Sequence, residues 1–134
     1  MQRIQWAVDN ASEGDTIIVR PGTYIENIDV DKSVDIRSYS QNPADTIIIA
    51  NNPDDHVFYV SANNVNITGF TVTGAGIWKA GVYLDNSDYS KIENVNASNN
   101  WNGIYLSSSN NNTLANNTAS SNNWLGIYLS FSNN

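Results

Sequence analysis

Short stretches in which apolar and polar residues alternate recur through the first half of this chain. None is longer than about five residues, and Asn, Asp, Ser, Gly or Pro bounds most of them. Alternation with a period of two is typical of a β-strand that buries one face. The sequence therefore predicts strands over 15–19, 27–30, 34–37, 46–49, 57–60, 65–68 and 70–73.

The first residues follow a helical period instead. Apolar residues stand at i, i+3, i+4 and i+7, which predicts one buried face of a short helix: Ile4, Ala7, Val8 and Ala11. Gly14 is placed to end this helix soon afterwards. Beyond the strand predicted over 15–19, the Arg-Pro-Gly-Thr sequence of residues 20–23 predicts a turn.

One motif, Gly-aliphatic-Tyr-Leu, occurs three times in the second half of the chain. Its copies begin at Gly81, Gly103 and Gly126, which are 22 and 23 residues apart. A tryptophan precedes each copy, at positions 78, 101 and 124. A sequence period in this range indicates a stack of repeats in which each repeat contacts its neighbours.

Three short strands recur in each period of about 22–25 residues. One coil takes strands 57–60, 65–68 and 70–73, the next takes 81–84, 91–94 and 95–98, and a third takes 103–106, 113–116 and 117–120, after which 126–129 opens another. This pattern predicts an all-β fold, a single-stranded parallel β-helix with three strands per coil. We expect a single domain over residues 1–134, with a helical cap at 1–14, first coils at 15–56 and regular repeats at 57–134.

Stacked coils place equivalent residues about 4.8 Å apart along the axis. We therefore expect two inward columns, Val82–Ile104–Ile127 and Leu84–Leu106–Leu129, and one outward column formed by Tyr83, Tyr105 and Tyr128. The last coil stops inside a repeat, so we expect its open strand edges to allow self-association.

Composition narrows the class of protein. Charged residues make up 14% of the chain, the net charge is −7, and no charged residue follows Glu93. Nucleic acid is a disfavoured partner, because phosphates need a basic surface.

Cysteine is absent, so there is no disulfide. No apolar run approaches the roughly 20 residues that span a bilayer, so we expect no membrane insertion by this segment.

The segment from Ile4 to Asn27 resembles the N-terminal cap and first coil of pectin-lyase-like right-handed β-helices. The Gly-Ile-Tyr-Leu and Asn-Asn-Thr repeats resemble those of NosD-type and carbohydrate-binding or sugar-hydrolase β-helix domains, which are common in surface proteins of methanogenic archaea. The resemblance covers the whole chain. It implies a right-handed coil and an extracellular or cell-surface location, with no signal peptide in this stretch. It implies little about function, because such domains include lyases, hydrolases, esterases, scaffolds and maturation factors.

Asparagine is concentrated in the repeats, with 14 copies between residues 94 and 134. Asn tolerates the left-handed backbone of tight turns and bonds to neighbouring backbone, so we expect stacked turn columns, with Asn94 over Asn116. Glycan-binding is the alternative role. Asn-X-Ser/Thr sequons occur at five positions, and we expect Asn116 to be buried, which leaves four candidate glycosylation sites: Asn10, Asn66, Asn96 and Asn111.

The repeated aromatic residues are the candidate carbohydrate-binding set. Aromatic rings pack on the apolar faces of sugars, and tyrosine hydroxyls can bond their rims. The structural alternative is that these rings only pack on one another or meet another chain. The set comprises Tyr83, Tyr105, Tyr128, Trp78, Trp101 and Trp124.

Acidic residues test the enzymatic alternative, because sugar hydrolysis needs two carboxyl groups across one bond. The catalytic candidates are Asp85, Asp88 and Glu93. Serines occupy the positions that stack with Asp85, so no second acid accompanies it. His56, the only histidine, follows two aspartates and is expected in a solvated loop.

Metals and cofactors receive little support from the sequence. Copper prefers His, Met or Cys, and this chain has one His, one Met and no Cys, so we expect no copper, no other metal and no cofactor. A calcium ion would be expected only for a lyase, whose base would be an Arg or Lys. Arg37 and Lys79 are available, but the sequence does not place them together.

We therefore expect a non-catalytic extracellular segment of a larger cell-surface protein, acting as a rigid scaffold or a glycan-contacting module. Its partner would be a polysaccharide or a cell-surface glycan. The alternative is a polysaccharide-degrading enzyme, a lyase or glycoside hydrolase, with its groove along the tyrosine column.

Overall fold

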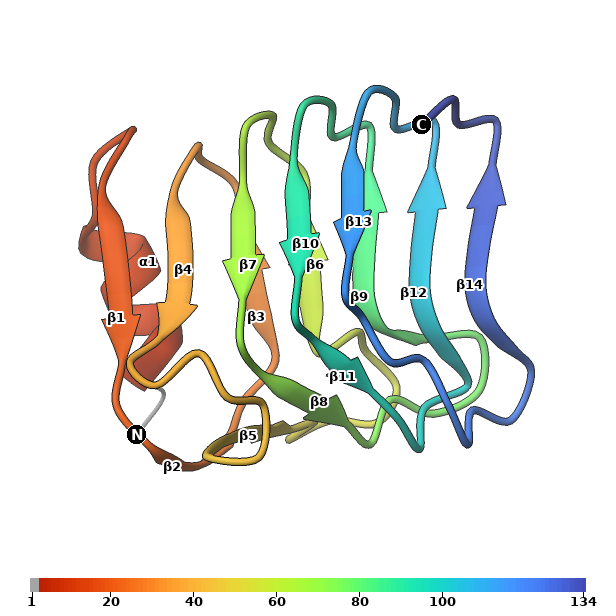
Figure 1. The fold of residues 1–134 in the computed structure, drawn as a ribbon, viewed down its shortest axis with the longest axis horizontal. Helices are drawn as coiled ribbons and strands as arrows, with labels where there is room; N and C mark the ends of the chain where they lie inside the picture. Colours follow the sequence, from red (N-terminus) through yellow and green to blue (C-terminus); the bar gives the residue numbers. More distant parts are fainter. Residues whose placement is uncertain (1–2) are drawn as a thin grey trace.

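The computed structural model describes residues 3–134 and shows a stack of coils, each built from short strands (Figure 1). Every strand pairs in parallel with its equivalent in the neighbouring coil. Three sheets run along the stack, of five, four and five strands. The predicted all-β, single-stranded parallel β-helix with three strands per coil is confirmed.

We name the three sheets A, B and C. Sheet A contains β1 (Thr16–Val19), β4 (Asp35–Ser38), β7 (Asn66–Thr68), β10 (Lys91–Glu93) and β13 (Thr113–Ala115). Sheet B contains β2 (Gly22–Ile25), β5 (Thr46–Ile49), β8 (Thr71–Thr73) and β11 (Asn96–Ala97). Sheet C contains β3 (Ile28–Val30), β6 (Phe58–Val60), β9 (Ala80–Asp85), β12 (Asn102–Ser107) and β14 (Leu125–Ser130).

Two of the predicted elements are wrong. The turn expected over 20–23 is shorter, because β2 begins at Gly22, whose N–H donates to the Asp45 carbonyl of the next coil at 2.9 Å. The strand expected over 117–120 is reduced to one bridge between Asn96 and Thr118. Left-handed residues on both sides of Thr118, at 116 and 121, leave too short an extended segment for a strand. Pairing between coils, more than local sequence, decides both cases.

The predicted columns form part of the core: Val82, Leu84, Ile104 and Leu106 are buried, whereas Ile127 and Leu129 of β14 are 47% and 42% exposed, so the expectation that these two are core residues is wrong. Val82 pairs with Ile104 and Ile104 with Ile127, and the three leucines of the motif pair in the same way. The columns also continue below the repeats, because Phe58 pairs with Val82 and Val60 with Leu84. An inward column of sheet A is equally regular: Ile17, Ile36, Ile67, Ile92 and Leu114. Burial of these side chains stabilises the stack by roughly 25 cal/mol per Å² of apolar surface.

The N-terminal end is closed by α1 (Arg3–Asn10), at the left of Figure 1. Ile4 and Val8 of this helix are buried, and the helix contacts β1 and β3. Glu26, only 1% exposed, lies at the start of the helix. Its carboxylate accepts the N–H groups of Ile4 and Gln5 at 3.1 Å. An acidic side chain 22 residues away therefore caps the helix and ties it to the first coil.

Asparagine side chains join the corners of neighbouring coils. Asn100 accepts the Ala75 N–H through Oδ1 at 3.0 Å and donates through Nδ2 to the Val72 carbonyl at 3.1 Å. Its own N–H donates to Oδ1 of Asn122 at 3.0 Å, so the same contact recurs one coil further on. These side chains satisfy the corner N–H groups of Ala75 and Asn100, and Asn100 adds a second hydrogen bond to the Val72 carbonyl, which also accepts the Ser98 N–H.

Asn94 and Asn116 occupy a different kind of corner. Both have left-handed backbone, with φ of 52° and 54°, as expected for Asn in tight turns. Asn116 is exposed, however, so the prediction that its column buries it is wrong. The buried asparagines are those whose amides reach into the coil interior, namely Asn100, Asn102 and Asn112.

The Glu26 cap leads to a prediction about stability. Changing Glu26 to Gln removes the charge that faces the helix N-terminus, so the free energy of unfolding should fall by about 1–2 kcal/mol. Urea titration with hydrogen exchange at the Ile4 and Gln5 amides measures this loss. Glu93→Gln is the matched control, because Glu93 makes only a surface ion pair with Lys91 and should cost about 0.5 kcal/mol or less. Equal losses in the two variants would contradict the assigned role of Glu26.

Candidate functional site

Four tyrosines form one outward row along sheet C, which we call the Tyr row: Tyr59, Tyr83, Tyr105 and Tyr128. Each is the central residue between two inward-facing apolar residues of its strand, which sets its direction. The ring centroids of successive members lie 5.5, 4.9 and 4.7 Å apart. The sequence predicted three members and missed Tyr59, because β6 reads Phe-Tyr-Val and lacks the repeated motif.

Successive rings of the Tyr row pack on one another, but only the Tyr105–Tyr128 pair is stacked, and the other two pairs are tilted. The ring planes are inclined to one another by 37°, 36° and 21° along the row. At centroid separations of about 5 Å, neighbouring rings cover part of each other's surface. The row is therefore not one flat ring surface, and only part of each ring is open to a ligand.

Three tryptophans form a second row, the Trp row, at the corner that leads into sheet C. Trp78 and Trp101 are 5.4 Å apart with planes inclined by 55°, and Trp101 and Trp124 are 6.1 Å apart and nearly parallel, at 9°. Trp78 is 71% exposed and Trp124 62% exposed. The Trp row therefore leaves large areas of indole surface open to solvent.

His56 is part of the Tyr row's surroundings. Its ring stacks on Tyr83 with centroids 4.3 Å apart, and it is 8% exposed, so its expected place in a solvated loop is wrong. The Ala80 N–H donates to His56 Nδ1 at 2.9 Å. Burial, aided by the charge of Lys79, lowers the pKa of His56 to about 4. The ring is therefore neutral at pH 7, with its proton on Nε2, where it is a hydrogen-bond donor.

Acidic groups accompany the N-terminal part of the Tyr row. The Tyr59 hydroxyl donates to Asp85 Oδ2 at 2.7 Å, and this hydrogen bond, with burial, raises the pKa of Tyr59 to about 12. Asp29 stands in register with Tyr59 on the adjacent strand. Burial and the nearby charge of Asp55 raise the pKa of Asp29. The sequence did not indicate this cluster, because its members are about one coil apart.

The three candidate catalytic acids are held apart. Asp85 ends β9 in sheet C, whereas Glu93 ends β10 in sheet A and makes an ion pair with Lys91 at 2.8 Å. Asp88 lies in the corner between these strands, where its Oδ1 accepts the Asn110 N–H at 2.6 Å. Each acid thus has a different hydrogen-bond or ion-pair partner, and the three carboxyl groups do not converge on one point.

The candidate bases and sequons are equally dispersed. Arg37 belongs to β4 of sheet A, and Lys79 precedes β9 of sheet C. Among the sequons, Asn10 and Asn111 are exposed, while Asn66 and Asn96 are half-buried on strands of sheets A and B. The fold therefore gathers neither the proposed bases nor the sequons into one site.

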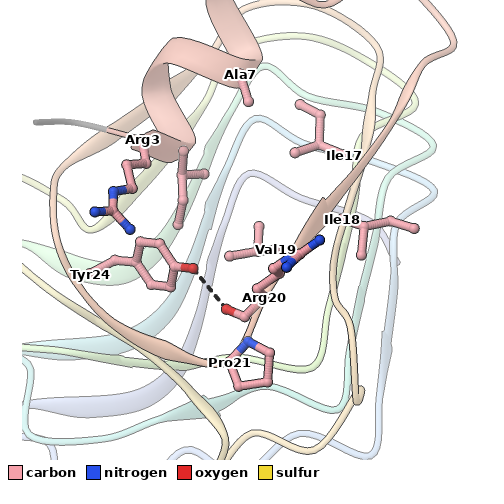
Figure 2. A pocket seen from close by; sticks show the side chains of 9 residues that line it. Arg3, Ala7, Ile17, Ile18, Val19, Arg20, Pro21 and Tyr24 are labelled. Carbon is pink, nitrogen blue, oxygen red and sulfur yellow. Dashed lines mark hydrogen bonds between the residues drawn. The ribbon is translucent and has the colours of Figure 1, made fainter.

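A cavity of about 460 Å³ lies beside α1 at the N-terminal end of the stack. Figure 2 shows Arg3 and Arg20 on its walls, with Tyr24 donating from its hydroxyl to the Arg20 carbonyl at 2.8 Å. Apolar side chains make up most of the remaining lining: Ile4, Ala7, Ile17, Ile18, Val19 and Pro21. The lining holds no carboxyl group or histidine, so it offers no acid–base pair.

Within residues 3–134, no three His, Cys, Asp or Glu side chains come together as a metal-binding group. The same residues include no helix of the length and apolarity needed to cross a membrane.

Comparisons with known proteins place the chain among β-helix proteins. The profile of a family described as periplasmic copper-binding protein (NosD) matches residues 8–134. A cell surface glycoprotein of Methanothermus fervidus is 38% identical over 94 residues, which cover 69% of this chain and 15% of that protein. The crystal structure of an alginate lyase from Paenibacillus sp. aligns with a TM-score of 0.72 and 22% identity, covering 84% of this chain and 40% of the lyase. That identity shows a shared fold alone.

The family description names copper, for which imidazole and sulfur groups are the preferred ligands. The single histidine, His56, accepts a backbone hydrogen bond at Nδ1 and stacks on Tyr83. Cysteine is absent, and the one methionine, Met1, lies outside the described residues. Copper sites combine several imidazole or sulfur ligands. The described residues do not fit such a site.

The buried neutral His56 predicts a pH-dependent stability. Because its folded-state pKa of about 4 lies below the ordinary 6.5, its contribution is complete above pH 6.5 and is lost as the pH falls toward 4. We expect this loss to be on the order of 2 kcal/mol. His56→Asn keeps an acceptor for Ala80 but does not titrate, so it should lack this step. Urea midpoints of both proteins at pH 7.5 and 4.5 measure the difference, and parallel curves would refute it.

Proposed function

Because the chain belongs to the family described as periplasmic copper-binding protein (NosD), with the β-helix described above, we propose that it is an extracellular segment of a larger cell-surface protein that contacts glycans. Similarity to a cell surface glycoprotein supports the location. The chain spans only 15% of the length of that relative, so the proposal concerns this segment.

The observation that carries the proposal is the pair of aromatic rows along sheet C. Exposed indole rings can pack on the apolar C–H faces of sugars, and the tyrosine hydroxyls, four or five residues further along the chain, can bond sugar rims. Trp78 and Trp124 leave most of their surface in water, although burial would stabilise such large rings. Repetition at the spacing of the coils suits an extended, repetitive ligand.

A scaffold role accompanies the binding role. Each coil is fixed to the next by strand pairing in three sheets and by corner contacts such as those of Asn100. A rod built in this way can hold a row of contact groups at constant spacing without losing conformational entropy on binding. Glycan contact and rigid spacing are then two aspects of one design.

The enzymatic alternative, a lyase or glycoside hydrolase acting along the Tyr row, has two observations in its favour. His56, Tyr59 and Asp85 lie together on sheet C, and the protein with a similar structure is named as an alginate lyase. The geometry gives this group little reactivity. His56 presents a donor instead of a free base, and Tyr59 already donates to Asp85. Glu93 lies on a different sheet from Asp85, so the two carboxyl groups do not flank one bond.

The Trp row provides the test of glycan contact. Trp124→Ala should weaken binding of a glycan recognised by the wild-type chain about tenfold or more, because it removes an exposed stacking ring. Isothermal titration calorimetry measures this change. Trp6→Ala is the matched control, since Trp6 is 65% exposed on α1, the helix that closes the N-terminal end of the stack, and belongs to neither aromatic row, so this variant should bind as the wild type does. Equal affinity of all three proteins would remove the Trp row from the site.

The same glycans decide the enzymatic alternative. We expect no new reducing ends and no unsaturated products from neutral or acidic polysaccharides, with or without Ca²⁺, from the wild type or from Asp85→Asn. Product detected with the wild type and absent with Asp85→Asn would establish catalysis and overturn the non-catalytic proposal.

A further inference from the structure

We propose that the ligand of the Tyr and Trp rows is an uncharged glycan. This inference rests on the proposed function and adds the chemical class of the ligand. It follows from how charge is distributed along sheet C.

The N-terminal part of the Tyr row is negative. Asp29 stands in register with Tyr59, and Asp85 accepts the Tyr59 hydroxyl at 2.7 Å. Asp55 precedes His56, and its charge is one of those that raise the pKa of Asp29. Lys79 is the cation whose charge reaches His56. A carboxylated sugar placed here would meet three carboxylates against one ammonium group.

The C-terminal part of the rows is neutral. No charged residue follows Glu93 in the sequence. Ser107 and Ser130 occupy the positions that stack with Asp85 in the next two coils. The residue column that begins with the Asp85 carboxylate therefore continues with hydroxyl groups. Tyr105 and Tyr128 lie in the neighbouring column of the same strands. These coils offer hydroxyl groups to a ligand, and no cation that could pair with an acidic sugar.

Hydroxyl groups suit uncharged sugars. A tyrosine or serine hydroxyl can both donate and accept, which matches the hydroxyl rims of a neutral sugar in either direction. Each uronate unit of an acidic polymer would lose hydration without gaining an opposite charge. An amino-sugar polymer would gain from the aspartates at one end of the rows only. An uncharged chain is the class that can use every coil of the rows.

The choice of ligand class is tested with oligosaccharides of equal length: mannan and glucan oligomers as neutral probes, alginate oligomers as acidic probes and chitosan oligomers as basic probes. In calorimetric titrations at 20 mM and 300 mM salt, a neutral oligomer should bind with a Kd that salt leaves unchanged. Alginate oligomers should bind at least tenfold more weakly at 20 mM salt, and the gap should narrow at 300 mM as repulsion is screened.

A positive charge placed in the row should reduce the preference for neutral oligomers. Ser130→Lys puts an ammonium group beside Tyr128, two coils from Asp85, so affinity for alginate oligomers should rise about three- to fivefold at low salt, and high salt should remove the gain. Thr118→Lys adds the same charge at an exposed position in line with sheet B, beside Asn96, and should produce no such gain. Both variants change exposed or half-buried outward residues, and circular dichroism verifies that they fold.

The outcomes are distinct. Wild-type binding of alginate or chitosan oligomers as tight as that of the neutral oligomers overturns the proposed ligand class and leaves glycan contact standing. The absence of a gain in Ser130→Lys, or an equal gain in Thr118→Lys, also overturns the inference, because the ligand then does not lie along the rows of sheet C. If none of the probes binds, the proposed function itself fails.

Discussion

Parallel pairing between equivalent residues of successive coils is the constraint on which the rest of this structure depends. Because the register is fixed, a residue type repeated at the period of the sequence becomes a column in space. Phe58, Val82 and Ile104 form such a column inside the stack, and the Tyr row forms one outside it. Core and candidate binding surface are therefore two faces of the same strands, and neither can shift without the other.

The corners explain why this protein has so little charge. A corner leaves backbone N–H and C=O groups without strand partners, and they are too enclosed to rely on water. Asn100 and Asn122 satisfy such groups in the preceding coil, and Ser109 does the same for Ser87. Short neutral side chains with donors and acceptors can be stacked at coil spacing, whereas stacked like charges would repel. The abundance of Asn and Ser is thus a requirement of the architecture.

Repetition in the sequence made much of this predictable. The Gly-aliphatic-Tyr-Leu copies led to the strand register, the inward columns and three members of the Tyr row. Features that occur once were harder to foresee. The sequence around Glu26 gives no sign that this residue caps a helix. His56 follows two aspartates, which suggested an exposed loop, although its ring stacks on Tyr83. Their partners are about one coil away along the chain, and only the folded stack shows which side chains meet.

The repetition of the Tyr and Trp rows once per coil has a consequence for how a long ligand of the proposed kind would bind. A polymer that packs on one set of these rings could pack on the next set after a shift of one coil, about 4.8 Å. Each further ring in contact would add to the total affinity, while the binding energies of neighbouring alignments would differ little. A polymer bound as proposed would therefore have several alignments of nearly equal energy, one coil apart, and could move between them along the rod without dissociating.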